Sequence, residues 1–259
     1  MDLKGHLYRL LPGRLQPRCK RAYLTLSPTR LTPGNIQRSL SSSLFDNDAA
    51  YRSYLAELDE SPFTEYRTVM RDRYDEHVGT QTTNEQKSIS GGLDDTAARN
   101  LYAVVRSLQP SVVVETGVHY GHSTAYILAA LSRNGHGHLH SVDPVAASSC
   151  PGDTEEPGWL VPETLRDDWT LHVGRSQRVL PELLPELGSV DLFLHDSDHS
   201  APCMLFEFEL AWEWLSERGL LVSDDIHWND AFPTFLDHRD GDAGRLSLNA
   251  GYVRPSGRR

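Results

Sequence analysis

From about residue 94 onward, short apolar runs alternate with segments whose apolar residues repeat every three to four positions. The runs lie at 112–114, 139–143, 169–173, 190–195 and 219–223, and the first of them is three β-branched valines. Such runs are typical of strands that are buried on both faces. The intervening segments have helical periodicity. This alternation predicts a parallel sheet that is covered by helices on both faces.

The clearest helix boundary precedes the first strand. Asp94 or Asp95 is placed to cap a helix that carries Leu101, Val104 and Leu108 on one face, and Pro110 stops it. Another helix is expected at 202–216. Near the C-terminus, Leu246–Leu248 and Tyr252–Val253 flank Asn-Ala-Gly and predict a closing hairpin. The expected fold is α/β and Rossmann-like: a doubly wound, mostly parallel seven-stranded sheet with a closing antiparallel hairpin.

The N-terminal third has a different pattern, which divides the chain into three parts. Residues 1–45 form a basic arm that ends in a Ser-rich stretch, 39–44, interpreted as a linker. Residues 46–92 form a helical cap or lid segment. Here Asp46 or Asn47 caps one helix, Pro62 occupies the first position of a second, and the polar residues 76–92 are a loop. Residues 93–259 form the main domain.

The composition is that of a soluble globular protein. Of 259 residues, 39% are hydrophobic and 24% are charged. Every apolar run is much shorter than the roughly 20 residues of a membrane span, and the start lacks a signal-peptide core. We therefore expect a cytoplasmic protein. The three cysteines are widely spaced and predict neither a disulfide framework nor a zinc site.

The charge is unevenly distributed. Residues 1–40 hold eight Lys or Arg and one acid, and the rest holds 17 basic and 35 acidic residues. The acidic body argues against a nucleic-acid partner. The basic arm is either a weak contact for an anionic membrane surface or partner, or a poorly ordered terminus. The two helices of 46–92 are candidates for a cap or for the contact of a homo-oligomer.

The first strand leads into the most informative loop. Val112–Val114 is followed by Glu115-Thr-Gly117-Val-His-Tyr-Gly121 and then by a helix. This is not the Gly-x-Gly-x-x-Gly of dinucleotide sites, and the acid Glu115 suits a cationic ligand. Asp143 ends the second strand, where a carboxylate binds ribose hydroxyls. These residues resemble those of the class I S-adenosylmethionine-dependent methyltransferases.

Carboxylates also follow the fourth and fifth strands. Asp196-Ser-Asp198-His199 comes after 190–195, and Asp224-Asp225 comes after 219–223. Carboxylates at neighbouring strand ends repel one another unless a cation lies among them, and hard oxygen ligands suit Mg²⁺ or Mn²⁺. The alternative is a set of solvated loop acids. Three histidines alternate at 136, 138 and 140, but no acid or Cys completes a metal set there, and a solvated strand edge is favoured.

The spacing of these acids resembles that of the metal-dependent O-methyltransferases, both the catechol type and those that act on macrolide or aminocoumarin sugars. The resemblance implies Asp196, Asp224 and Asp225 as metal ligands, with Asp198 as an alternative ligand, and His199 as the general base. It implies S-adenosylmethionine as cofactor. The implied cofactor contacts are Glu115, Gly117, His119, Gly121, Ser123, Asp143, Ser176 and Gln177.

The implied activity is methylation of a hydroxyl on a small vicinal diol, either a sugar or a phenolic compound. His227 and Trp228 follow the acid pair and either line the substrate pocket or pack as an ordinary loop. Two alternatives stay open: an RNA or protein methyltransferase that uses the basic arm, and an inactive binding module of the same fold.

Overall fold

The computed structural model describes residues 32–78, 92–144, 156–239 and 241–256. Its centre is a seven-stranded sheet in the order β3-β2-β1-β4-β5-β7-β6. Strands β1 to β5 are parallel, and β7 is antiparallel to both β5 and β6. The strands are β1 Val112–Thr116, β2 His138–Asp143, β3 Trp169–Val173, β4 Val190–His195, β5 Leu215–Ser223, β6 Gly241–Arg245 and β7 Gly251–Pro255.

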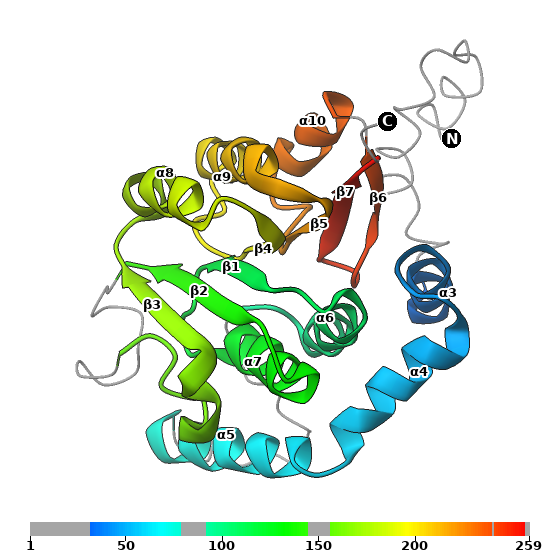
Figure 1. The fold of residues 1–259 in the computed structure, drawn as a ribbon, viewed down its shortest axis with the longest axis vertical. Coiled ribbons are helices and arrows are strands. Elements are labelled where there is room, and N and C mark those ends of the chain that lie inside the picture. Colours follow the sequence, from blue (N-terminus) through cyan, green and yellow to red (C-terminus); the bar gives the residue numbers. More distant parts are fainter. Residues whose placement is uncertain (1–31, 79–91, 145–155, 240, 257–259) are drawn as a thin grey trace.

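Helices cover both faces of this sheet (Figure 1). Helices α8, α9 and α10 lie over one face, α6 and α7 lie over the other, and α3, α4 and α5 wrap around the outside of α6 and α7. The helices are α3 Pro33–Leu44, α4 Asp48–Ala56, α5 Phe63–Val78, α6 Asp95–Leu108, α7 His122–Asn134, α8 Ser176–Leu187, α9 Ala201–Trp214 and α10 Ala231–Asp237, with short 3₁₀ turns η2 Glu57–Asp59 and η3 Glu163–Asp168. The predicted fold class is confirmed.

Local sequence accounts for several of these boundaries. The Asp94 carboxylate accepts a hydrogen bond from the amide of Ala97 at the start of α6, and Gln109 ends this helix in a left-handed conformation before Pro110. Asn47, one of the two predicted caps, accepts from the amide of Ala50 at the start of α4. Gly135 closes α7 with a positive φ.

The interpretation of residues 39–44 as a linker is wrong, because they are the second half of α3. Thr32 caps this helix, and a proline occupies its first turn. Ile36 and Leu40 lie one turn apart and are 3% and 0% exposed. Burial of this face stabilises a helix in spite of the weak helix preference of the four serines.

Three other boundaries also differ from the prediction. Helix α5 begins at Phe63, and the Pro62 carbonyl accepts from the amides of Glu65 and Tyr66, so the proline precedes the helix. Strand β5 begins at Leu215, inside the expected helix 202–216. The first hairpin strand is Gly241–Arg245, and 246–250 is the loop that follows it. In that loop the Ser247 hydroxyl accepts from the amides of residues 249 and 250, which turns the chain too early for a strand.

The N-terminal helices share the core of the main domain. Leu40, Tyr51, Leu58 and Met70 belong to the same buried cluster as the apolar faces of α6 and α7. A second cluster lies under α8, α9 and α10. The expected loop and lid at 76–92 falls largely outside the described residues, as do residues 1–31 of the arm. Among the helices that the structure describes, none is long and apolar enough to cross a membrane.

Candidate functional site

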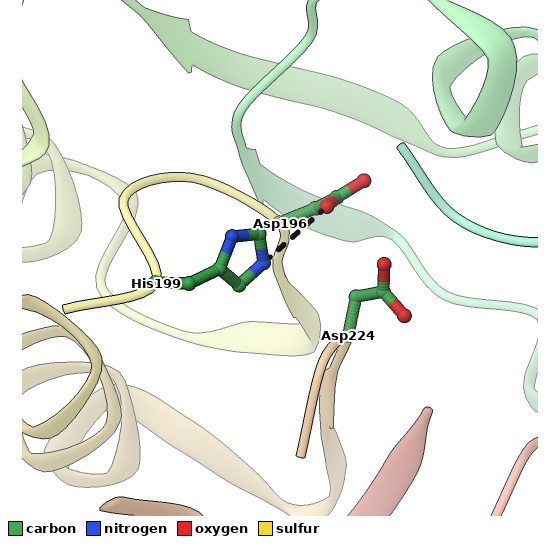
Figure 2. A group of neighbouring side chains, drawn as sticks. All are labelled: Asp196, His199 and Asp224. Carbon is green, nitrogen blue, oxygen red and sulfur yellow. Dashed lines mark ion pairs between the residues drawn. The ribbon is translucent and has the colours of Figure 1, made fainter. Parts of the chain in front are cut away.

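The acids predicted to bind metal lie at the carboxyl ends of β4 and β5. Asp196, His199 and Asp224 each offer one ligand atom, and these atoms all lie within 4.8 Å of one another. Figure 2 shows the His199 ring and the two carboxylates converging from two adjacent loops. The His199 Nε2 atom is 3.7 Å from Asp196 Oδ1 and 3.9 Å from Asp225 Oδ2. Two parallel strands therefore bring together residues that are far apart in the sequence.

The Asp196 side chain is only 6% exposed, and its Oδ2 accepts a hydrogen bond from the amide of Leu93. Burial and then the charges of Asp224 and Glu115 raise the pKa of Asp196 well above its usual value. Burial is also the main cause that raises the pKa of Asp224, to about 6. Asp224 Oδ1 is buried and has no hydrogen-bond partner among the residues that the structure describes. Such crowding of buried carboxylates fits a divalent cation, whose charge would stabilise them in ionised form.

The neighbouring acids are placed differently. Asp225 has a left-handed backbone with a φ of 47°, and its side chain is 35% exposed. It lies beside His199 but is not one of the three convergent residues. The exposed Asp198 accepts from the amide of Ser200 at the start of α9. Its carboxylate therefore bonds to the residue that immediately precedes the helix. The ligand roles of Asp196, Asp224 and Asp225 stay predictions.

His199 lies at the edge of this group. Its side chain is 22% exposed, and burial, followed by the nearby His195, lowers its pKa. The ring is therefore neutral at pH 7 and has a nitrogen able to accept a proton. The side-chain amide of Asn229 donates to the His199 carbonyl, which attaches the β5–α10 loop to this residue. The same loop places Trp228, 71% exposed, with its ring centroid 6.3 Å from that of His199.

The glycines of the β1–α7 loop are required by packing. At Gly117 the φ is 82°, and a Cβ atom would lie 2.0 Å from the Asp196 carbonyl oxygen. At Gly121 the φ is 90°, and a Cβ atom would lie 2.8 Å from the Gly158 Cα. Side chains at either position would therefore separate the loop from its neighbours. Gly117 in particular allows the predicted cofactor loop to lie directly against the backbone of Asp196 and Ser197.

Glu115 is the most deeply buried of the predicted cofactor residues. Its carboxylate accepts hydrogen bonds from the hydroxyls of Ser123, Thr124 and Ser141, at 2.6, 2.8 and 2.7 Å. Burial nevertheless raises its pKa. This carboxylate ties β1 to β2 and to the start of α7. Cofactor contacts through the Glu115 and Ser123 side chains are untested, and both groups are engaged with each other here.

Asp143 lies at the end of β2 and is partly exposed. Its Oδ2 atom accepts from the amides of Val118 and His119, at 2.7 and 3.0 Å. These bonds hold the loop in place, and in it His119 adopts a left-handed φ of 49°. The His119 ring lies against the Tyr120 ring, with centroids 3.7 Å apart. The predicted ribose ligand thus already orders the loop that would surround the cofactor.

Ser176 and Gln177 lie together at the start of α8. Ser176 is buried, and the Gln177 side-chain amide donates to the Cys203 sulfur at 3.0 Å. The amide of Gly174 donates to the Asp143 carbonyl, which connects this turn to the end of β2. All predicted cofactor residues therefore lie at the carboxyl ends of β1 and β2, on the loop after β1, or in the first turn of α7 or α8.

Of the three alternating histidines, His138 and His140 lie in β2 and His136 precedes it. His138 Nε2 lies 2.8 Å from the Thr170 hydroxyl, and His140 Nδ1 lies 3.1 Å from His172 Nε2. His136 bonds to backbone carbonyls. In the described part of the chain these histidines form no metal-binding group of three.

Sequence reasoning missed two features of the site. The first is the pair of Glu207 and His195, both 0% exposed, which lies behind Asp196. A signal existed, because Glu207 is an acid within the apolar stretch of α9. The second is the segment 156–162, which packs on Gly121 and on Tyr120. Its irregular sequence gave no signal for this role.

Comparison with known proteins agrees with this geometry. Residues 114–226 match the model of a family described as a methyltransferase domain. A candidate O-methyltransferase from Klebsiella pneumoniae is 15% identical, covers 84% of this chain and 97% of its own, and has a TM-score of 0.52. No curated protein sequence matches the chain significantly.

Two further structures share the fold at a similar level. The cofactor-bound Rv0187 protein from MTB is 15% identical, with 88% of this chain and 99% of that chain covered and a TM-score of 0.51. An SAH-bound methyltransferase from Podospora anserina is 12% identical, with 82% and 97% covered and a TM-score of 0.50. The family model thus matches the part of the chain that runs from β1 to the end of β5, and these solved structures share the fold of the described chain.

Proposed function

We propose that this class I methyltransferase domain transfers a methyl group from S-adenosylmethionine to a hydroxyl of a small vicinal diol, with the help of a divalent cation. The observation that carries the proposal is the convergence of Asp196, His199 and Asp224 within 4.8 Å, directly against the Gly117 loop. A cation site and a cofactor site would then be immediate neighbours. The O-methyltransferase description of a structural neighbour supports the reaction type.

The residues divide into two sets. Asp143 and the loop from Gly117 to Gly121 would hold the cofactor. Glu115 and Ser123 would lie beneath this loop. Ser176 and Gln177 would lie beside the adenine. Asp196 and Asp224 would hold Mg²⁺ or Mn²⁺, with Asp225 as the third predicted ligand. When bound, the cofactor supplies the sulfonium methyl, and the cation supplies charge that lowers the pKa of the acceptor hydroxyl.

His199 would take the proton of that hydroxyl at Nε2. Its lowered pKa keeps the ring neutral at pH 7, which is the form that a general base requires. Asn229 holds its backbone, so the ring has a defined position relative to Asp196. Much of the rate gain would come from this positioning of the diol beside the methyl donor.

Trp228 would provide one wall for the acceptor. It is 71% exposed although it is the largest apolar side chain near the site. An exposed aromatic ring beside a polar centre is typical of a surface on which a sugar or phenolic ring stacks. This supports a small ring-shaped acceptor. Residues 1–31 of the basic arm, which an RNA or protein substrate would use, lie outside the described residues.

Removal of the cation tests the proposal directly. Methyl transfer to a panel of catechols and sugar diols should stop in excess EDTA and return with added Mg²⁺ or Mn²⁺. The Asp224→Asn variant should stay inactive after the same addition. Undiminished turnover in EDTA would contradict the metal role. Cofactor binding without turnover on any acceptor would instead favour an inactive binding module.

A further inference from the structure

The carboxylate of Glu207 is the centre of a buried hydrogen-bond network behind the candidate metal site. Its Oε2 accepts from the Thr116 hydroxyl and lies 2.6 Å from His195 Nδ1. Its Oε1 accepts from the Ser197 hydroxyl at 2.7 Å and from the Cys203 thiol at 3.4 Å. Every one of these donors is supplied by a strand end, a strand-end loop or α9 itself.

The donors surround Asp196 on three sides. His195 and Ser197 are its two neighbours in the chain, and Thr116 is the last residue of β1. The Asp196 amide donates to the Thr116 carbonyl at 2.9 Å. A single carboxylate therefore holds the residue before Asp196, the residue after it, and the strand against which its backbone lies.

The network extends to His199 through a ring contact. Because Nδ1 of His195 faces Glu207, the His195 ring has one fixed orientation. It meets the His199 ring edge-on, with centroids 5.4 Å apart and planes at 82°. It meets Phe208 in the same way at 5.2 Å. Movement of His195 would consequently displace His199 as well as Asp196.

A buried charge at this position needs an explanation. Fully buried acids are costly unless they are paired and hydrogen-bonded, and an apolar residue would suit the interior of α9 better. Burial alone would raise the pKa of Glu207. The hydrogen bond and charge of His195, followed by the hydroxyls of Ser176 and Thr116, outweigh burial and lower that pKa to about 2. Glu207 thus stays ionised at every pH at which the protein would act.

We infer that Glu207 is a positioning residue for the cation site: it fixes the backbone on both sides of Asp196 and, through His195, the ring of His199. The inference rests on the proposed function. Groups that orient metal ligands in this way commonly affect metal affinity by 10- to 100-fold when they are replaced. Glu207 would act without touching the cation, the cofactor or the acceptor.

The test is to measure Mn²⁺ binding to the Glu207→Gln variant. The electron paramagnetic resonance signal of free Mn²⁺ gives the bound fraction. Gln keeps the shape but replaces one acceptor oxygen with an NH₂ donor, so it loses either the bonds from Thr116 and His195 or those from Ser197 and Cys203. We expect Mn²⁺ to bind 10- to 100-fold more weakly, while S-adenosylmethionine affinity changes less than 3-fold. A general loss of structure would weaken both ligands together, so the ratio of the two effects separates positioning from stability.

Two further variants complete the experiment. Glu209→Gln is the matched control, because Glu209 is on the same helix but pairs with Arg239 at the surface, and its Mn²⁺ affinity should equal that of the wild type. Ser197→Ala removes one hydrogen-bond donor to Glu207 and should weaken Mn²⁺ binding by a smaller factor. This variant tests the inference if Glu207→Gln does not fold. Equal Mn²⁺ affinity of the wild type, Glu207→Gln and Ser197→Ala would overturn the inference alone. Failure of the wild type to bind Mn²⁺ would overturn the cation part of the proposed function together with it.

Discussion

At the scale of single residues, the site depends on buried carboxylates that lie close together. Asp196 and Asp224 both have raised pKa values because they are buried near other carboxylates. His199 has a lowered pKa, and its side chain is more exposed than that of Asp196. The same three residues can therefore hold a cation and receive a proton. The His199 role is the one that mutation can separate from cofactor binding.

Replacing His199 with Ala should lower kcat by roughly 10²–10⁴-fold if the ring takes the proton of the substrate hydroxyl. S-adenosylmethionine affinity should barely change, because His199 lies beside Asp196 and Asp224 and not on the β1–α7 loop. The measurement is steady-state kinetics with a calorimetric check of cofactor binding. His238→Ala is the control, since the ring of this exposed histidine bonds to the Thr234 carbonyl of α10. A near-normal kcat for His199→Ala would assign proton removal to another group.

Sequence predicted which residue types would gather at the strand ends, but not what each side chain bonds to. The positions of Asp196 and Asp224 follow from two strand ends in a parallel sheet, and this could be read from spacing. Glu115 was expected to face a cationic ligand, yet three hydroxyls surround it, one of them from Ser141 on the next strand. The buried partners of Glu207 likewise come from β1, β4 and α9. Such long-range pairs have no local sequence signal.

At the scale of elements, the central strands and helices follow their local pattern, whereas the N-terminal helices depend on packing. The alternation of apolar runs and helical segments was enough to predict β1 to β5 and the helices between them. Helix α3 could not be predicted, because its serines are poor helix formers and only burial of Ile36 and Leu40 stabilises it. Helix α5 has a further role, because it contacts the segment that packs on the predicted cofactor loop.

Arg73 makes that contact. Its guanidinium donates to the carbonyls of Trp159 and Val161 at 2.9 and 2.8 Å, and Val161 packs against Gly121. Arg73→Met should loosen this segment and raise the Kd for S-adenosylmethionine roughly 10-fold, about the equivalent of one lost charged hydrogen bond. Calorimetry would measure it. Arg67→Met is the control on the same helix, because Arg67 is exposed and lies 3.9 Å from Asp59. An unchanged Kd for Arg73→Met would separate α5 from cofactor binding.

At the scale of the whole molecule, the N-terminal extension and the main domain form one core. Besides the apolar contacts, Glu57 in the turn η2 between α4 and α5 accepts hydrogen bonds from Tyr102 and Arg106 of α6, each at 2.7 Å. Burial would raise the pKa of Glu57, but the bonds from Arg106 and Tyr102 outweigh it and lower this pKa. A carboxylate with a lowered pKa contributes stability above its unfolded pKa of about 4.5, and this contribution is lost as the pH falls.

Glu57→Gln should therefore lower the free energy of unfolding at pH 7 by about 1.5–3 kcal/mol, the usual contribution of hydrogen bonds to a charged group. The difference from the wild type should shrink as the pH falls below about 4.5, because the wild-type carboxyl then becomes protonated too. Urea unfolding at several pH values would measure it. Asp48→Asn should change stability by well under 1 kcal/mol, because its pair with Arg52 is exposed. A difference that stays constant with pH would exclude a charge-based role for Glu57.

The central claim is that a cofactor site and a cation site lie side by side in this domain. Calorimetric titration of S-adenosylmethionine, with and without Mg²⁺, tests it most directly. We predict one-to-one cofactor binding in both conditions. In Asp143→Ala the cofactor affinity should be weakened by about 1.5–3 kcal/mol, because bonds to a charged group are lost. A separate Mg²⁺ binding event should be present in the wild type and disappear in Asp224→Asn. The absence of any S-adenosylmethionine binding by the folded wild-type protein would contradict the account.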